Sequence, residues 1–144
     1  MKILILVILF ILLFSRIKYT PICLSKTLWK KDVLQSIEKK KQINIDEDDK
    51  TKQIGYAIIL VFFLQLFLAI FYIVLGNKIG TTEFIILSAL QVISCIWNFI
   101  NNLQDVTTIY STDINDFTYR RFNRLFNLIL DYIYYPWAIY MLLK

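Results

Sequence analysis

Four apolar stretches alternate with polar segments along the chain. They cover residues 3–14, 54–76, 84–103 and 125–143. The second is the clearest, because Gln65 is its only strongly polar side chain and it exceeds the ~20 residues that cross a bilayer as a helix. The first is the weakest, since its twelve consecutive apolar residues fall short of that length. The pattern predicts an all-α, multi-pass integral membrane bundle with four transmembrane segments.

The first apolar segment has two interpretations. Lys2 followed by a short apolar core is typical of a cleavable signal peptide. Residues 15–21 contain no pair of small residues suited to cleavage, however, and the residues before Cys23 do not suit a lipoprotein signal. We therefore interpret residues 1–18 as an uncleaved transmembrane anchor. It should lie at the periphery of the bundle, because it presents no polar or small face to another helix.

The remaining segments predict a hairpin and a separate C-terminal helix. Residues 54–104 should form an antiparallel pair of transmembrane helices, because only residues 77–83 link their apolar stretches. The C-terminal segment, residues 125–144, contains Asp131 and Pro136. It either spans with a kink or breaks at the proline and lies partly in the interface. We predict that it spans, because a break would leave two short apolar halves.

Basic residues are concentrated in two of the segments between apolar stretches. Residues 15–53 hold ten lysines and arginines, and residues 104–124 hold three. The N-terminal end of the chain, the link between the two hairpin helices and the C-terminal end hold one each. With four spans the two rich segments share a side. The positive-inside rule then predicts that both termini lie outside and that both long loops, residues 19–53 and 105–124, are cytoplasmic. A bacterial plasma membrane is the default location.

The first long loop predicts a basic amphipathic helix. Apolar residues recur at helical spacing from Leu28 to Ile37. The lysines among and after them are Lys30, Lys31, Lys39, Lys40 and Lys41. Because these lysines lie between apolar runs, we expect them to bind the anionic lipid leaflet and not nucleic acid.

The third apolar stretch carries a polar stripe. Its members share an arc of about 100° on a helix. They are Ser88, Gln91, Cys95, Asn98, Asn102 and Asp105. Because acyl chains offer polar groups no partner, this stripe should face protein or water. Gln65 lies on a matching face of the preceding helix, so we predict a hydrogen bond between Gln65 and Gln91.

Asp131 is the acidic residue within the fourth apolar stretch. Counting inward from the cytoplasmic ends places it at the depth of Cys95 and Asn98, facing the third helix. No basic residue is expected at that depth. Asp131 is then either protonated or held by donors such as Asn98 and Tyr135, because an isolated buried carboxylate is too costly.

The composition supports the membrane interpretation and excludes several chemistries. Apolar residues make up 58% of the 144 residues and charged residues 19%. The chain has no histidine, and its two cysteines lie far apart in the sequence, which argues against a metal or thiol redox centre. Three glycines cannot supply a phosphate-binding or dinucleotide-binding loop. We therefore expect no metal and no cofactor.

Three function classes follow from these patterns. The polar cluster around Asp131 is either a proton or cation site or a set of contacts that hold helices together. We favour the second interpretation, and with it a non-catalytic accessory or scaffold subunit of a larger membrane complex. Its partners would be other membrane subunits or a second copy. The alternative is a self-assembling pore, an immunity-type protein or a small transport protein using Asp131. An intramembrane enzyme is disfavoured, since no serine or cysteine has an evident base.

Overall fold

Helices make up most of the described chain. The computed structural model describes residues 2–41, 47–107 and 113–144. Its elements in chain order are α1 (Lys2–Leu24), α2 (Lys26–Lys41), α3 (Glu47–Ile79), α4 (Thr82–Thr107), the 3-10 turn η1 (Ile114–Asp116) and α5 (Arg121–Leu143). The all-α prediction is confirmed within these residues.

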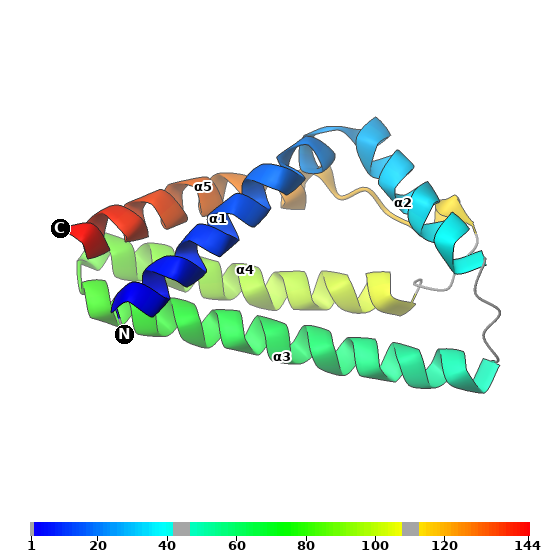
Figure 1. Cartoon of the computed structure of the whole chain (residues 1–144), viewed down its shortest axis with the longest axis horizontal. Coiled ribbons are helices and arrows are strands. Elements are labelled where there is room, and N and C mark those ends of the chain that lie inside the picture. The colour runs from blue at the N-terminus through cyan, green and yellow to red at the C-terminus, as the bar shows by residue number, and fades with distance from the viewer. Residues whose placement is uncertain (1, 42–46, 108–112) are drawn as a thin grey trace.

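The helices α3 and α4 pack side by side as an antiparallel hairpin, as the short link predicts (Figure 1). Gly80 ends α3 with a φ of 72°, a left-handed conformation that glycine adopts at low cost. Four residues earlier, Gly76 allows close contact between the helices. A Cβ atom at this position would lie 2.8 Å from the Oγ atom of Ser88 on α4. The two glycines therefore have different tasks, one in the turn and one in the helix contact.

The helix α1 packs against α5, which contradicts the expectation of a peripheral first helix. Ile5 and Leu9 are 7% and 0% exposed and belong to the main core cluster. The helix also continues to Leu24, through Pro21, beyond the boundary predicted at residue 18. Packing between smooth apolar surfaces leaves no polar or small-residue pattern in the sequence, so the prediction missed it.

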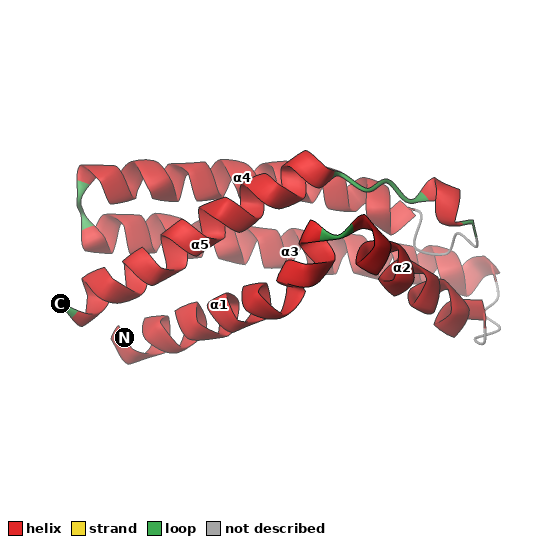
Figure 2. Ribbon diagram, turned by 90° about the horizontal axis from the view of Figure 1, so that it is seen from above, coloured by secondary structure: helices red, strands yellow, loops and turns green. Residues whose placement is uncertain are grey.

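Both termini and the α3–α4 turn lie at one end of the bundle, which we call the termini end. The helix α2 lies at the opposite end, which we call the loop end (Figures 1 and 2). At the termini end an aromatic core joins α3, α4 and α5. Its most deeply buried side chains are Phe84, Tyr134, Tyr135, Leu75 and Ala138. The ring of Phe84 lies 4.9 Å from that of Tyr134. This core fixes the α3–α4 hairpin against α5.

Three helices are long and apolar enough to cross a bilayer: Lys2–Leu24, Asp49–Ile79 and Thr82–Leu103. The length and composition of these three helices indicate an integral membrane protein. The 23-residue α5 is not one of these three, so the fourth span stays a prediction. With 33 residues, α3 is about 50 Å long, against about 30 Å for the hydrocarbon core. It begins earlier than predicted, and its first turns extend past the end of α4 at the loop end (Figure 1).

The predicted loop helix is present as α2, but its apolar residues do not all face outward. Trp29 and Ile37 are 8% and 4% exposed, whereas Leu28 is 44% exposed. The Trp29 ring lies 5.2 Å from the ring of Tyr119, in the segment that leads into α5. This part of α2 therefore packs on protein, and the helix is more firmly attached to the bundle than a helix lying freely on lipid.

Candidate functional site

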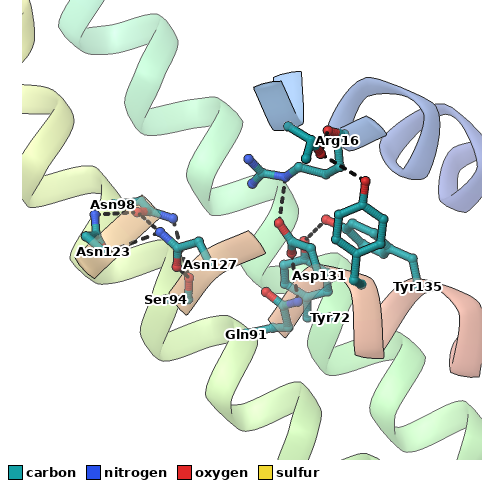
Figure 3. A network of polar contacts seen from close by, with 11 residues as sticks. Arg16, Tyr72, Gln91, Ser94, Asn98, Asn123, Asn127, Asp131 and Tyr135 are labelled. Atoms are coloured by element: carbon teal, nitrogen blue, oxygen red, sulfur yellow. Dashed lines mark hydrogen bonds and ion pairs between the residues drawn. The ribbon is translucent and has the colours of Figure 1, made fainter. Parts of the chain in front are cut away.

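Asp131 on α5 is the centre of a buried polar cluster between the helices (Figure 3). Its Oδ2 atom lies 2.6 Å from the Nε atom of Arg16 on α1. Its Oδ1 atom accepts a hydrogen bond of 2.9 Å from the Nε2 atom of Gln91 on α4. The Asp131 side chain is 3% exposed and that of Arg16 is 38% exposed. The acid thus points towards α4, as predicted, and three helices meet at one carboxylate.

Arg16 corrects the prediction that no basic residue lies at the depth of Asp131. Arg16 lies near the end of the predicted anchor, residues 1–18, but its charge was counted with those of the cytoplasmic loop that follows. In the structure the helix continues past it, so Arg16 lies within a candidate span and its long side chain reaches the acid. A buried charge is strongly destabilising unless it is paired, and Arg16 provides this pairing. Of the two donors named in advance, Tyr135 hydrogen-bonds to Asp131, whereas Asn98 bonds to Ser94, Asn123 and Asn127 instead.

Two tyrosines on α5 extend the cluster towards the termini end. The hydroxyl groups of Tyr72 on α3 and Tyr135 on α5 share a hydrogen bond of 2.7 Å. Those of Ser88 on α4 and Tyr134 on α5 share one of 3.1 Å. Each buried hydroxyl group thus has a partner on another helix, as buried polar groups require. These bonds connect the ion pair with the aromatic core.

Amide side chains extend the cluster towards the loop end. Ser94 on α4 donates a hydrogen bond to Asn127 on α5. The Nδ2 atom of Asn127 donates to the Oδ1 atom of Asn98 at 2.7 Å and to that of Asn123 at 3.2 Å. These residues link α4 to α5 as the ion pair does, but with neutral groups (Figure 3).

The structure places most of the predicted stripe inside the protein. Ser88, Gln91 and Cys95 are buried, Asn98 is half-buried, and Asp105 is exposed near the end of α4. The predicted bond between the two glutamines is not formed. Gln91 binds Asp131 instead, and the half-buried Gln65 lines a cavity beside it. The acid is the stronger acceptor, because it carries a charge.

The sequence analysis missed several members of the cluster, above all Arg16, Tyr72 and Ser94. Ser94 lies three residues after Gln91 and four before Asn98, so the helical spacing of the stripe was sufficient to include it. For Arg16 the available signal was chemical. An intramembrane acid implies a partner, and Arg16 is the basic residue that follows the first apolar run.

The predicted lipid-binding lysines belong to another part of the molecule. Lys30, Lys31 and Lys39 are exposed on α2, at the loop end and away from the cluster (Figure 1). The side chains of Lys40 and Lys41 lie outside the described residues.

Two cavities adjoin the cluster. The inner cavity has a volume of about 140 Å³ and contains Asp131, Gln91 and Tyr135 in its wall. A larger one of about 300 Å³, which we call the vestibule, is lined by the ends of α1 and α4 and the start of α5. The two share Arg16, Gln65 and Asn98. A polar lining thus continues from the buried acid to the loop end.

Asp105 is the carboxylate in the vestibule wall. Although Asp105 is exposed as a residue, the protein around its carboxyl group desolvates it enough to raise its pKa above the ordinary value, and nearby Arg120 and Arg124 only partly offset that effect. Arg124 lies over the rings of Trp29 and Tyr119, with its guanidinium carbon 5.7 and 5.5 Å from their centroids. The vestibule therefore combines guanidinium groups, one carboxyl group and several amides.

The cluster as a whole is arranged to hold helices and charge in place. Its acid is neutralised by a guanidinium group, and its hydroxyl and amide groups bond to one another across helices. Among the described residues no three or more histidine, cysteine, aspartate or glutamate side chains gather in a way that could hold a metal ion. Comparison of the chain with protein-family models, with curated proteins and with solved structures finds no match.

Proposed function

We propose that this chain is a non-catalytic accessory or scaffold subunit of a larger membrane complex. The observation that carries the proposal is the pairing of Asp131 with Arg16 and Gln91. A carboxylate with both oxygen atoms engaged by residues of two other helices is suited to fixing those helices. It is poorly suited to cycling a proton, because protonation would break the pair and leave the Arg16 guanidinium group without its counter-charge.

The outer surfaces supply a second argument. On α1 the side chains that face away from the core are apolar and exposed, among them Leu4, Ile11 and Phe14 at 63%, 61% and 69%. Such a face suits either lipid or the helix of a partner subunit. At the loop end, α2 and the first turns of α3 project beyond the other helices (Figure 1). A projecting pair of helices gives a partner a polar surface to contact outside the hydrocarbon core.

A small transport protein is the second candidate, supported by the two cavities that meet at Arg16. Their shared polar lining offers a path for water from the loop end to Asp131. A transporter of this kind would need the ion pair to open during its cycle. The two candidates therefore differ in whether the pair is permanent.

The first test is affinity purification of the tagged chain from its native host in mild detergent, followed by native mass spectrometry. The accessory-subunit proposal predicts a complex with other subunits at a fixed ratio. Photo-crosslinkers at Ile11 and Phe14 should capture the same partner, whereas one at Phe63 on the exposed face of α3 serves as the matched position. A clean monomer or homo-oligomer, with no crosslinked partner from any position, would contradict the proposal.

The second test separates transport from assembly. The purified chain is reconstituted in liposomes and proton and cation fluxes are measured for the wild type, Asp131→Asn and Asp32→Asn. Asp32 is an exposed acid on α2 and controls for the loss of one charge. The accessory-subunit proposal predicts no flux above empty liposomes for any of the three proteins. A flux that Asp131→Asn abolishes and Asp32→Asn preserves would establish the transport alternative.

A further inference from the structure

The vestibule lies at the level where the candidate membrane spans end. Two of those spans end at Leu24 on α1 and Leu103 on α4. The cavity wall includes Cys23, one residue before the first of these ends, and Asp105, two residues after the second. A cavity at this level faces the zone in which a leaflet carries its headgroups.

The wall of the vestibule is polar on every side. Each of its twelve residues carries a polar or thiol side chain, and three of them are arginines. Arg16 is balanced by Asp131. Among the wall residues that the structure describes, Arg120 and Arg124 lie with the carboxyl group of Asp105, so the formal charge of these side chains is positive.

Arg124 is held in a way that leaves its charge available. It lies over the Trp29 and Tyr119 rings and forms no ion pair with a carboxylate in the part of the chain that the structure describes. Stacking on rings fixes the plane of a guanidinium group, while its N–H groups, which lie in that plane, can still donate to an oxyanion.

The start of α5 adds a further anion-favouring group to the same space. The helix α5 begins at the vestibule, and its N-cap residue, Arg120, provides no side-chain cap. The positive end of the helix dipole and the first N–H groups favour an anion there. An uncapped helix end thus coincides with the arginines.

We propose that the vestibule binds a phosphate-type oxyanion, either the headgroup of an anionic phospholipid or free phosphate. Guanidinium groups bind phosphate oxygens in pairs, and the start of α5 adds backbone N–H donors. A volume of about 300 Å³ is sufficient for a phosphate group with part of a glycerol headgroup. The proposal does not depend on whether the chain acts as a subunit or a transporter.

The experiment uses the full chain in detergent micelles. Retention of phosphatidylglycerol is measured by native mass spectrometry against phosphatidylcholine, and binding of sodium phosphate is measured by titration calorimetry against sodium chloride at equal ionic strength. Preferred retention of phosphatidylglycerol alone assigns the site to a lipid headgroup. Binding of sodium phosphate as well assigns it to the phosphate group itself. Both outcomes support the proposal.

Two variants test whether the vestibule is the site. Arg124→Gln removes one guanidinium group, and Asn123→Asp adds a carboxylate to the wall. The second should keep the fold, because an acidic residue in the first turn of α5 is favourable to the helix. We expect each to weaken the apparent Kd for phosphatidylglycerol by about tenfold or more. The matched control is Lys31→Gln, which removes an exposed positive charge on α2 and should change the Kd by less than about twofold.

The proposal is overturned by either of two results. One is the absence of any preference for phosphatidylglycerol and of any phosphate binding in the wild type. The other is a folded Asn123→Asp protein that binds as tightly as the wild type, since a new carboxylate in an occupied oxyanion site must repel the ligand. Equal losses in Lys31→Gln and Arg124→Gln count against it too, because they would indicate adsorption to the basic surface of α2.

Discussion

At the termini end the long helices pack through aromatic rings, whereas at the loop end they meet through amides and guanidinium groups. Phe84, Tyr134 and Leu75 are almost completely buried at the first end. At the second, Asn98 and Asn123 are half-buried and line a cavity of about 300 Å³. The same helices thus form a dry contact at one end and a polar, open one at the other. The ion pair of Asp131 lies between them.

The difference shows how a small membrane bundle divides two tasks. Lipid tails are as apolar as a protein core, so burying apolar surface gives helices little reason to associate in a bilayer. Close packing of rings and small residues supplies that reason at the termini end. At the loop end the amide side chains pack less densely, and a polar cavity, the vestibule, lies open among them. Substitutions at the two ends should therefore differ in cost, and the following variants measure that difference by unfolding in mixed micelles.

The largest effect is expected for Phe84→Ala. This ring is 0% exposed and contacts the rings of Tyr134 and Trp137. Its removal should lower the free energy of unfolding by about 3 kcal/mol, the lower part of the range for buried phenylalanine, because packing and not hydrophobic transfer is lost. The control Phe63→Ala removes a ring that is 62% exposed and should change stability by less than about 0.5 kcal/mol. Similar losses in both variants would mean that the aromatic core is not closely packed.

Gly76→Ala should have the next largest effect. The new Cβ atom would lie 2.8 and 2.9 Å from the Oγ and Cβ atoms of Ser88, so α3 and α4 must separate slightly. We expect a loss of about 2 kcal/mol. Gly55→Ala is the matched variant in the same helix, where nothing lies within 4 Å of the new atom. It should be neutral or stabilise by up to about 1 kcal/mol through helix propensity. A neutral Gly76→Ala would contradict the close helix contact.

Tyr72→Phe tests the hydroxyl pair at the edge of the aromatic core. The variant keeps the ring and removes the hydroxyl group that bonds to that of Tyr135. We expect a loss of about 1 kcal/mol, within the range measured for hydrogen bonds between transmembrane helices. Tyr140→Phe, at a side chain that is 62% exposed, is the control and should be neutral. Equal stability of Tyr72→Phe and the wild type would show that the bond contributes nothing.

Asn127→Ala is expected to have the smallest effect, although it removes three hydrogen bonds. Asn127 lines the vestibule, so water can take the place of its amide beside Ser94 and Asn98. We expect a loss of about 0.6 kcal/mol, which is less than that of Tyr72→Phe. A larger loss for Asn127→Ala than for Tyr72→Phe would reverse the comparison between the two ends.

The helices themselves were predictable because hydropathy is a local property. The α3–α4 hairpin, the buried stripe from Ser88 to Cys95 and the inward direction of Asp131 all followed from spacing along one helix at a time. Residues 47–53 did not, because their charges were interpreted as the end of a loop. In the structure the helix α3 begins at Glu47 and includes them.

The contacts between helices were harder to predict. Arg16 lies 115 positions before Asp131, and its role depends on how far α1 continues and on the reach of a long side chain. The docking of Ile5 and Leu9 rests on shape alone, which leaves no periodic signal in an all-apolar helix. The predicted partner of Gln91 was wrong for a related reason. Gln65 and Asp131 were both suitable acceptors on neighbouring helices, and only the fold decides which of them Gln91 contacts.

The most direct test of the account is a double-mutant cycle on Arg16 and Asp131 in mixed micelles. Arg16→Gln leaves a carboxylate that is 3% exposed without its counter-charge, whereas Asp131→Asn leaves a guanidinium group that is 38% exposed. The account predicts that Arg16→Gln is the more destabilising, at up to about 3 kcal/mol, and that the double variant is more stable than the sum of the single losses implies. Additive losses, or an Asp131→Asn protein less stable than Arg16→Gln, would contradict the ion pair.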